Sequence, residues 1–280
     1  EIIGQYGEWL VVYHVVDEYA AYGGLPPSYV PIMRVLEEKL LRRADVVFVT
    51  APALLQSKSR LNPHVHLVPN AVDYDGFQQI LAGASLPDAI TSLPSPVIGY
   101  VGAINDKLDY GLLAGIAVAR PRWTFAMVGP VDVRTPEDIA GLNAVRTASN
   151  TRWLGTVSVP DVPRYIAGCN VCILPYKVNE RTRSISSLKL YEYLACGKPV
   201  VSTPIPAAQE GGEEVLVAGD AESFVHQIEQ ALNDDPEATE RRRRVAAANT
   251  WDQRVETISA ILAESLRGRN RRDASITDNE

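Results

Sequence analysis

Short apolar runs alternate with helix-like segments over most of this chain, from about residue 10 to residue 217. The first three apolar runs are LVVYHVV, DVVFV and HVHLV, and the helix-like segment PIMRVLEEKLLRRA separates the first two. A chain in which strands and helices take turns builds βαβ units, whose sheets are mostly parallel. The alternation therefore predicts an α/β fold.

Six further apolar runs form a second series, and they read PVIGYVG, WTFAMVG, RWLG, NVCILP, KPVVS and EEVLV. Six strands fit one complete doubly wound domain, whereas the three earlier strands fit only the back half of a similar domain. We therefore predict two Rossmann-like domains, the first incomplete because part of it is missing in front of Glu1, and a C-terminal helical extension. The predicted limits are 1–84 for the first domain, 85–96 for a linker, 97–250 for the second domain, 251–268 for a helix and 269–280 for a disordered tail.

The overall charge and hydropathy limit the partners of the chain. A net charge of −7 and a pI near 5.3 argue against nucleic-acid binding through overall charge. No apolar stretch reaches the roughly 18 residues of a membrane-spanning helix and no leader pattern opens the sequence, so we expect a cytoplasmic protein. The basic runs at 241–244 and 267–272 are expected to be a solvated helix face and a frayed end. Peripheral contact with the inner face of a membrane is the alternative.

The cysteines and histidines do not form a metal-ligand pattern. The odd, sparse set of cysteines fits buried thiols in a reducing compartment, and its members are Cys169, Cys172 and Cys196. Their single CxxC lacks a second ligand pair. We expect His14 to be packed in the core, and His64 and His66 to lie on a strand surface. The sequence thus predicts no metal site.

Ligands of open parallel sheets bind at the carboxyl ends of the strands, where loops and helix N-termini present N–H groups to anions. In the second domain this rule selects five loops, namely 102–107, 129–131, 155–159, 176–187 and 203–211. The fourth loop leads directly into a helix, and it contains Arg181, Arg183, Ser184, Ser186 and Ser187. Positive charge, hydroxyl groups and a helix N-terminus together suit a diphosphate.

The segment SISSLKLYEYLACGKPVVST, residues 184–203, predicts a helix followed by a short buried strand. Ser186 or Ser187 can cap the helix, and the glycine and proline of CGKP end it. Its apolar face is predicted at Leu188, Tyr191, Leu194 and Ala195. On the same helix Glu192 can accept hydrogen bonds from ribose hydroxyls, or it can form an ordinary surface pair with Lys189. The spacing alone leaves both open.

Several other nucleotide-binding and catalytic motifs are absent from the sequence. There is no GxxxxGK[ST] phosphate loop, and no GxGxxG fingerprint follows any strand. A GxSxG nucleophile elbow, an HExxH zinc motif and an EF-hand loop are also missing. These absences argue against the P-loop and dinucleotide-binding classes.

Three stretches, in the order PVIGYVGAINDKLD, RWLGTVSVPDVPRYIAGCNVCILPY and SLKLYEYLACGKPVVST, resemble the donor-binding domain of GT-B fold glycosyltransferases. The likeness is greatest to the retaining, nucleotide-sugar-dependent group that acts in bacterial polysaccharide assembly. In the first domain, ADVVFVTAPAL and VPNAVDYDGF are similar to segments of the same family. The resemblance extends to about Leu266, and its third stretch is the most specific.

The resemblance implies roles for several residues. Glu192 matches the helix glutamate that holds the nucleotide ribose, and Ser186 and Ser187 match the helix N-terminus that cradles the diphosphate. Gly102 matches the glycine that lets the donor approach the first strand. The other substrate-binding candidates are the cationic residues Arg181, Arg183 and Lys189.

Three positions depart from the family pattern. The first glutamate of the pattern falls on Ser184, and the nearest acid is Glu180. The arginine expected after the strand glycine is Ala103, which leaves Lys107 or the cations named above to neutralise the leaving diphosphate. The glycine of VPNGVD is Ala71. The catalytic candidates are therefore Glu180, Lys107 and Asp17. Asp17 lies at the end of the first strand, where it can contact the acceptor or cap the strand.

The function implied by the resemblance is that of a hexosyltransferase enzyme. It would move a sugar from a nucleoside diphosphate sugar to a hydroxyl of a glycan or lipid-linked acceptor, in polysaccharide or glycolipid assembly. The donor is a substrate, and we expect no cofactor. Two alternatives stay open: a non-catalytic GT-B-like partner module that binds nucleotide or glycan, and a GT-B nucleotide-sugar epimerase. The altered glutamate spacing and the missing arginine are what the partner module predicts.

Overall fold

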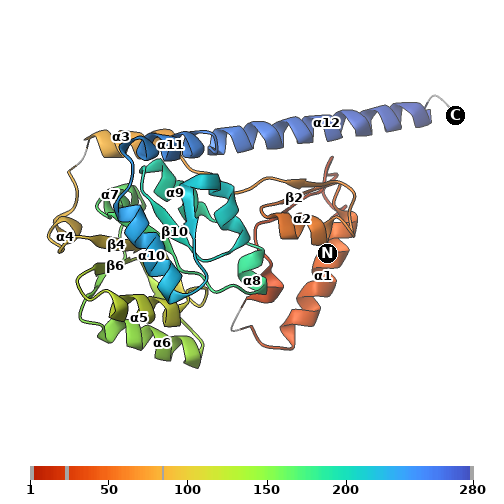
Figure 1. Cartoon of the computed structure of the whole chain (residues 1–280). Helices are drawn as coiled ribbons and strands as arrows, with labels where there is room; N and C mark the ends of the chain where they lie inside the picture. Colours follow the sequence, from red (N-terminus) through yellow and green to blue (C-terminus); the bar gives the residue numbers. More distant parts are fainter. Residues whose placement is uncertain (1–2, 23–24, 84, 278–280) are drawn as a thin grey trace. The chain divides into compact units, whose positions relative to one another are not determined.

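The computed structural model describes residues 3–22, 25–83 and 85–277, and it divides the chain into two compact units (Figure 1). The first unit comprises Glu1–Asn70, Ser184–Ser186 and Trp251–Glu280, and the second comprises Ala71–Arg183 and Ser187–Thr250. The chain thus passes between units at Asn70, earlier than the limit predicted at residue 84. The C-terminal helix belongs to the first unit.

Three parallel strands form the sheet of the first unit, in the order β1 (Val12–Val15), β2 (Val46–Val49) and β3 (Val65–Leu67). These are the three strands predicted for the first domain, so that prediction is confirmed. The helices of the unit are η1 (Tyr19–Ala21), α1 (Tyr29–Arg43), α2 (Pro52–Lys58) and α12 (Trp251–Thr277).

Both faces of β2 are covered, because successive side chains of a strand point to opposite sides. Val47 and Val49 pack on one face in a core that also contains Leu41 of α1 and Leu54 of α2. On the other face Val46 and Phe48 form a core with Val68, and the apolar side chains of α12 packed against it are Ile258, Ile261 and Leu262. The last helix of the chain therefore completes the core of the first unit.

Two predictions for the first unit are wrong. His14 is exposed on β1, one of the two edge strands of the sheet, and its ring meets Phe48 edge on at 6.2 Å. The predicted disordered tail at 269–280 is helical as far as Thr277, since α12 continues beyond residue 268. The last three residues of that tail, 278–280, lie outside the described residues.

The sheet of the second unit has six parallel strands in the order β11-β10-β9-β4-β6-β8. Their bounds are β4 (Val97–Val101), β6 (Thr124–Val128), β8 (Thr151–Gly155), β9 (Val171–Leu174), β10 (Val200–Ser202) and β11 (Val215–Val217). All six predicted strands are confirmed. A small second sheet, β5 (Ile104–Asn105) with β7 (Val131–Asp132), links two of the predicted loops and was not anticipated.

Helices connect the strands of the second unit. They are α3 (Tyr74–Gly83), α4 (Asp88–Thr91), α5 (Tyr110–Ala119), α6 (Pro136–Thr147), η2 (Val159–Asp161), α7 (Val162–Ala167), α8 (Glu180–Arg183), α9 (Leu188–Ala195), η3 (Pro206–Glu214), α10 (Ala221–Leu232) and α11 (Pro236–Ala247). The predicted linker at 85–96 contains α4, whose Ile90 is buried. The three cysteines are free and buried, as predicted.

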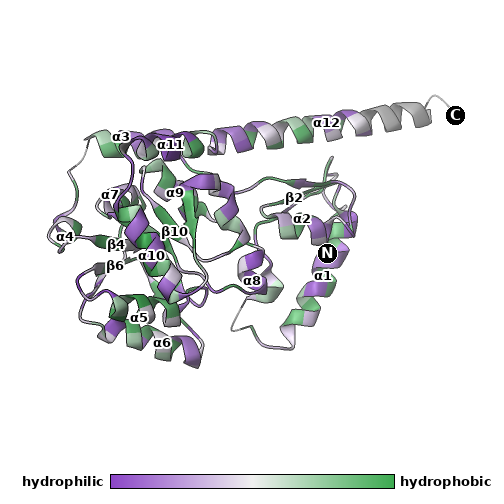
Figure 2. Ribbon diagram, in the orientation of Figure 1, coloured by the Kyte–Doolittle hydropathy of each residue, from purple (hydrophilic) through white to green (hydrophobic). Residues whose placement is uncertain are grey.

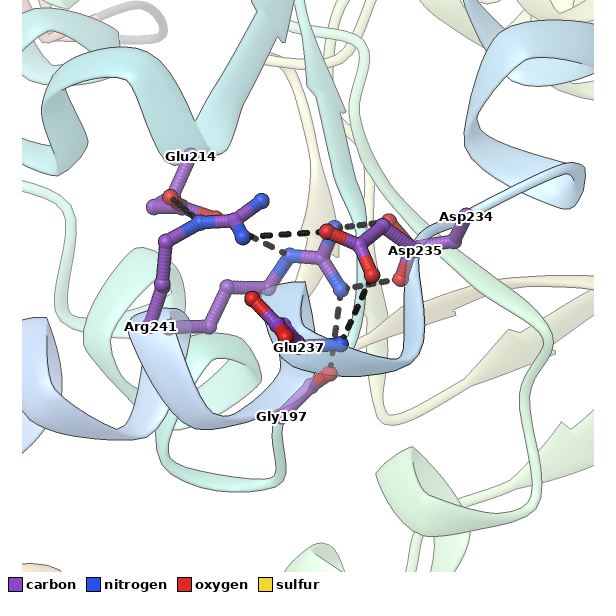
Figure 3. A network of polar contacts seen from close by, with 7 residues as sticks. Gly197, Glu214, Asp234, Asp235, Glu237 and Arg241 are labelled. Carbon is purple, nitrogen blue, oxygen red and sulfur yellow. Dashed lines mark hydrogen bonds and ion pairs between the residues drawn. The ribbon is translucent and has the colours of Figure 1, made fainter.

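Helix α11 carries the first basic run and is mainly purple, hence hydrophilic, in Figure 2. The run is not a simple solvated face, because the guanidinium of Arg242 is buried and donates to both carboxylate oxygens of Asp234 at 2.6 Å. It also donates to the carbonyl oxygen of Gly197 at 3.3 Å, in the turn that ends α9. The neighbouring Arg241 is exposed and bonds Glu214 and Asp235 (Figure 3). Arg242 therefore ties α11 to the end of α9.

Candidate functional site

Three adjacent strands of the second unit end on glycines whose φ angles are positive. They are Gly102 after β4, Gly129 after β6 and Gly155 at the end of β8, with φ of 145°, 136° and 72°. The Gly102 N–H donates to the Val128 carbonyl at 2.7 Å, and the Gly129 N–H donates to the Gly155 carbonyl at 2.8 Å. A Cβ on Gly129 would lie 2.2 Å from the Gly102 carbonyl oxygen. Only glycine allows the strand ends to approach so closely, and bare backbone lines this edge of the sheet.

Helix α9 brings a lysine to this edge. A Cβ built on Gly102 would lie 1.8 Å from Nζ of Lys189 and 1.9 Å from its Cε, so the end of the lysine side chain lies against the Gly102 backbone. Burial lowers the pKa of Lys189, and the nearby Glu192 opposes that shift. The structure thus brings together two residues that the sequence predicted separately.

Glu192 lies on the same helix, one turn further along. Burial raises the pKa of its carboxyl group above the usual value, while Lys189 lowers it. Neither side chain is fully exposed, and the structure records no ion pair between these two described residues. They do not form the surface pair that their spacing left open. A half-buried ammonium and a half-buried carboxylate of this kind are suited to polar groups of a ligand.

The start of α9 differs from its predicted capping. Ser187 is the N-cap residue by position, but its buried hydroxyl makes no capping hydrogen bond to the helix. Ser186 instead accepts from the Asn70 N–H at 3.1 Å, and its carbonyl accepts from the Asn70 amide at 2.8 Å. Tyr191, Leu194 and Ala195 of the predicted apolar face are buried, but Leu188 is exposed. Leu190 and Tyr193, which the single-face pattern left out, are also buried, because the helix is enclosed on more than one side.

A layer of buried tyrosines lies beneath the site, and the sequence patterns above did not predict it. Tyr100 and Tyr176 meet edge to face at 6.4 Å between ring centroids. The Lys107 ammonium lies 5.0 Å from the centre of the Tyr176 ring, a cation–π contact. Tyr193 bonds the backbone of β4 through its hydroxyl. The available signal was Tyr100 within the apolar run VIGYV, because a buried phenol needs a polar partner.

The remaining predicted residues of the second unit lie on α8. Glu180 and Arg183 are exposed there, and Thr182 is buried and exchanges two hydrogen bonds of 3.0 Å with Asn179. Burial raises the pKa of the Tyr176 phenol, Glu192 raises it further and Arg181 lowers it. Arg181 and Glu192 therefore both act electrostatically on the tyrosine beneath the site.

In the first unit, Asp17 follows β1 at its carboxyl end. Its carboxylate accepts a hydrogen bond of 2.6 Å from the Tyr22 hydroxyl. The adjacent Glu18 bonds the ammonium of the buried Lys58 at 2.8 Å, and Glu37 bonds the same ammonium at 2.8 Å. Of Asp17, Glu18 and Glu37, Asp17 is thus the acid that does not pair with Lys58.

No helix in the described part of the chain is long and apolar enough to cross a membrane. Within residues 3–22, 25–83 and 85–277, no group of three or more histidine, cysteine, aspartate or glutamate side chains is arranged to hold a metal ion.

The chain is similar to known glycosyltransferases. It is 30% identical over 233 residues to TuaH of Bacillus subtilis (strain 168), whose name assigns it to teichuronic acid biosynthesis as a glycosyltransferase. The match covers 79% of this chain, and the chain spans 57% of the length of that relative.

Two solved structures resemble about nine tenths of the chain. Sucrose-phosphate synthase from Thermosynechococcus elongatus superposes with a TM-score of 0.68 at 20% identity, over 92% of this chain and 67% of that one. HepE of Anabaena, in complex with UDP and glucose, gives 0.69 at 17% identity, over 90% and 71%. At these identities the likeness shows the fold, and it confirms the predicted GT-B class.

The family model described as "Glycosyl transferases group 1" matches residues 95–234, half of the chain. This chain therefore belongs to the group 1 glycosyltransferase family.

Proposed function

We propose that the protein transfers a sugar from a nucleoside diphosphate sugar to a hydroxyl acceptor in polysaccharide or glycolipid assembly. The observation that carries the proposal is the Lys189 ammonium held against Gly102, where β4 ends. A cation and a helix N-terminus together stabilise a diphosphate, and Lys189 is the second residue of α9. The family membership makes a nucleotide-sugar donor the natural source of that diphosphate.

In the proposed mode of binding, the diphosphate lies at the start of α9, between Lys189 and the bare backbone at Gly102. The Ser187 hydroxyl, at the N-cap of α9, supplies a hydrogen bond there, and Glu192 accepts hydrogen bonds from the ribose. Lys107 and Arg181 add positive charge near the same tyrosine. This arrangement accounts for an ammonium and a carboxylate that are both partly buried without an ion pair between them.

The reaction follows from that binding. The acceptor oxygen forms a bond to the anomeric carbon and the bond from that carbon to the phosphate oxygen breaks. The nucleoside diphosphate leaves with the electron pair and takes up the proton that the acceptor hydroxyl loses. Preorganised cations stabilise the charge that develops on the leaving group while the sugar gains oxocarbenium character. Asp17 is the proposed acceptor contact. Retention of configuration is proposed from the family likeness.

The donor and acceptor classes are proposed from the relatives. HepE was solved with UDP and glucose and with UDP-glucose, so UDP-glucose is the first donor to test. The name of TuaH supports a glycan or lipid-linked acceptor. We propose a cytoplasmic protein that meets such an acceptor at the membrane surface, and a reaction that needs no metal ion or other cofactor. Turnover in the presence of EDTA is then expected to equal turnover with added Mg²⁺.

A non-catalytic partner module is the second candidate. It is favoured by the buried Ser184, where the family pattern has a glutamate, and by the exposure of the nearest acid, Glu180. Isothermal titration with UDP and UDP-glucose, followed by measurement of UDP release with glycan and lipid-linked acceptors, separates the two. Release of UDP that requires an acceptor supports the transferase, whereas tight binding without release supports the module. Absence of nucleotide binding contradicts the transferase and a nucleotide-binding module, and it leaves only a module that binds glycan.

A further inference from the structure

The strand next to the proposed diphosphate site is paired unequally on its two sides. β4 pairs with β6 along its whole length, from Val97 to Val101. With β9, on its other side, it pairs only at Ile98 and Gly99. The strand order also changes direction here, since β6 and β8 lie on one side of β4 and β9, β10 and β11 on the other. β4 and β9 therefore separate at the topological switch point, where open sheets form their ligand crevice.

This separation leaves Val101 without a partner strand on the β9 side, although Val101 is buried. A buried backbone N–H and C=O must be satisfied, because an unmade hydrogen bond there costs about 1 to 3 kcal/mol. The Tyr193 hydroxyl supplies both bonds. It accepts from the Val101 N–H at 2.9 Å and donates to the Val101 carbonyl at 3.2 Å. One side-chain hydroxyl thus replaces the missing strand.

Tyr193 and Lys189 are four residues apart on α9, and Val101 immediately precedes Gly102. The two bonds of Tyr193 therefore attach the helix to β4 one residue before the position where the Lys189 side chain rests. Tyr193 is fully buried, so its ring is held in one position by the surrounding side chains.

We propose that Tyr193 is a positioning residue that keeps β4 and β9 apart at their carboxyl ends and fixes Lys189 over Gly102 for the diphosphate. The inference rests on the proposed function, because it assigns Tyr193 a role in donor binding. A merely structural tyrosine would contribute to stability alone. A positioning tyrosine affects the binding of the diphosphate more than the binding of the nucleoside, because it acts through Lys189.

The test is Tyr193→Phe, which keeps the ring and removes the hydroxyl. Its matched control is Thr151→Val, which also removes a buried hydroxyl with two backbone bonds, to Val145 and Ala148, at the amino end of β8. Binding is measured by titration with whichever of UDP, ADP, GDP and dTDP the wild type binds most tightly, and with the matching nucleoside. Tyr193→Phe is expected to weaken diphosphate binding about tenfold, the effect of one lost charge-assisted hydrogen bond. It should change nucleoside binding by less than about twofold, and Thr151→Val should change neither.

A double-mutant cycle with Lys189→Met checks the route of the effect. The loss caused by Tyr193→Phe is expected to disappear in the Lys189→Met background, because there is no ammonium left to misplace. Full additivity overturns the inference, and so does equal binding by Tyr193→Phe and wild type. A wild type that binds none of the four diphosphates contradicts the proposed function itself. Should Tyr193→Phe fail to fold, amide exchange in the wild type decides: slow exchange at Val101 supports the inference and fast exchange overturns it.

Discussion

At the scale of single residues, the contact between Lys189 and Gly102 carries the most functional meaning. The sequence indicated both residues, one from the rule about strand ends and one from its place on a helix, but it could not show that they meet. Their contact depends on how α9 packs over the end of β4, which is set by residues far apart in sequence. The unanticipated bond between Ser186 and Asn70 has the same cause, since the two lie 116 positions apart.

Lys189→Met is predicted to weaken binding of a nucleoside diphosphate by about 1.5 to 3 kcal/mol, the contribution of hydrogen bonds to a charged group. Isothermal titration measures the change. Lys198→Met is the matched control, because Lys198 lies just beyond the opposite end of α9. Equal affinities of Lys189→Met and wild type would contradict the assignment of this lysine to the diphosphate.

Glu192→Ala is predicted to weaken nucleotide binding by about 1 to 3 kcal/mol, because the ribose loses hydrogen bonds to a charged group. Affinity is measured by titration with the nucleoside diphosphate that the wild type prefers. The exposed carboxylate of Glu222, on α10, provides the control variant Glu222→Ala, for which no change is expected. An unchanged affinity in a folded Glu192→Ala protein would count against the ribose contact.

Glu192→Gln gives a separate prediction about stability without ligand. Burial raises the pKa of this carboxyl in the folded protein, so the folded state holds the proton more tightly than the unfolded chain. That contribution to stability is full below the unfolded pKa of 4.5 and is lost as the pH rises through the raised value. Glu192→Gln should therefore melt higher than wild type at about pH 8, and the difference should vanish by about pH 4. A lower melting temperature for the variant at the higher pH is the opposite outcome.

Gly102→Ala is predicted to damage folding and binding together. The φ of 145° strains any residue with a Cβ, by about 1 to 3 kcal/mol, and the new methyl group would occupy the place of the Lys189 side chain. Thermal melting and diphosphate titration measure the two effects. Gly83→Ala, on α3, has open space around the added Cβ and a helical backbone, so it should not weaken binding. Full affinity of Gly102→Ala would show that the lysine does not act from this position.

At the scale of secondary-structure elements, the alternation of apolar runs predicted all nine strands of the two large sheets, because each lies in a short apolar run of the sequence. It did not predict β5 and β7, which have two residues each and lie within loops. Nor did it predict the length of α12. The polar composition of residues 269–280 suggested disorder, whereas the structure continues the helix to Thr277.

The buried arginine on α11 gives a prediction at this scale. Arg242→Met leaves the Asp234 carboxylate and the Gly197 carbonyl without their cation, so we expect the free energy of unfolding to fall by about 3 kcal/mol. Arg241→Met removes the adjacent but exposed arginine, and its cost should stay below about 1 kcal/mol. Urea unfolding of the two variants provides the comparison. Equal losses would show that burial of the guanidinium is not what ties α11 to the end of α9.

At the scale of the whole molecule, each unit has a parallel sheet and a core of its own, and the C-terminal helix returns to the first unit. The sequence predicted two Rossmann-like units, but it placed their division at residue 84 because the proline- and serine-containing segment there is typical of a linker. That segment instead includes a helix with a buried isoleucine, and the chain passes between units at Asn70. The burial of Ile90 is a tertiary contact, and the composition of the segment alone does not predict it.

In the proposed function, the diphosphate of a nucleotide-sugar donor binds where α9 begins and β4 ends. A crystal structure of the protein with UDP would locate the diphosphate. We predict a diphosphate oxygen within about 3.2 Å of Lys189 Nζ, the usual limit of a hydrogen bond, and ribose hydroxyls on the Glu192 carboxylate. A complex in which the diphosphate binds at another strand end, with Lys189 still resting on Gly102, would contradict it.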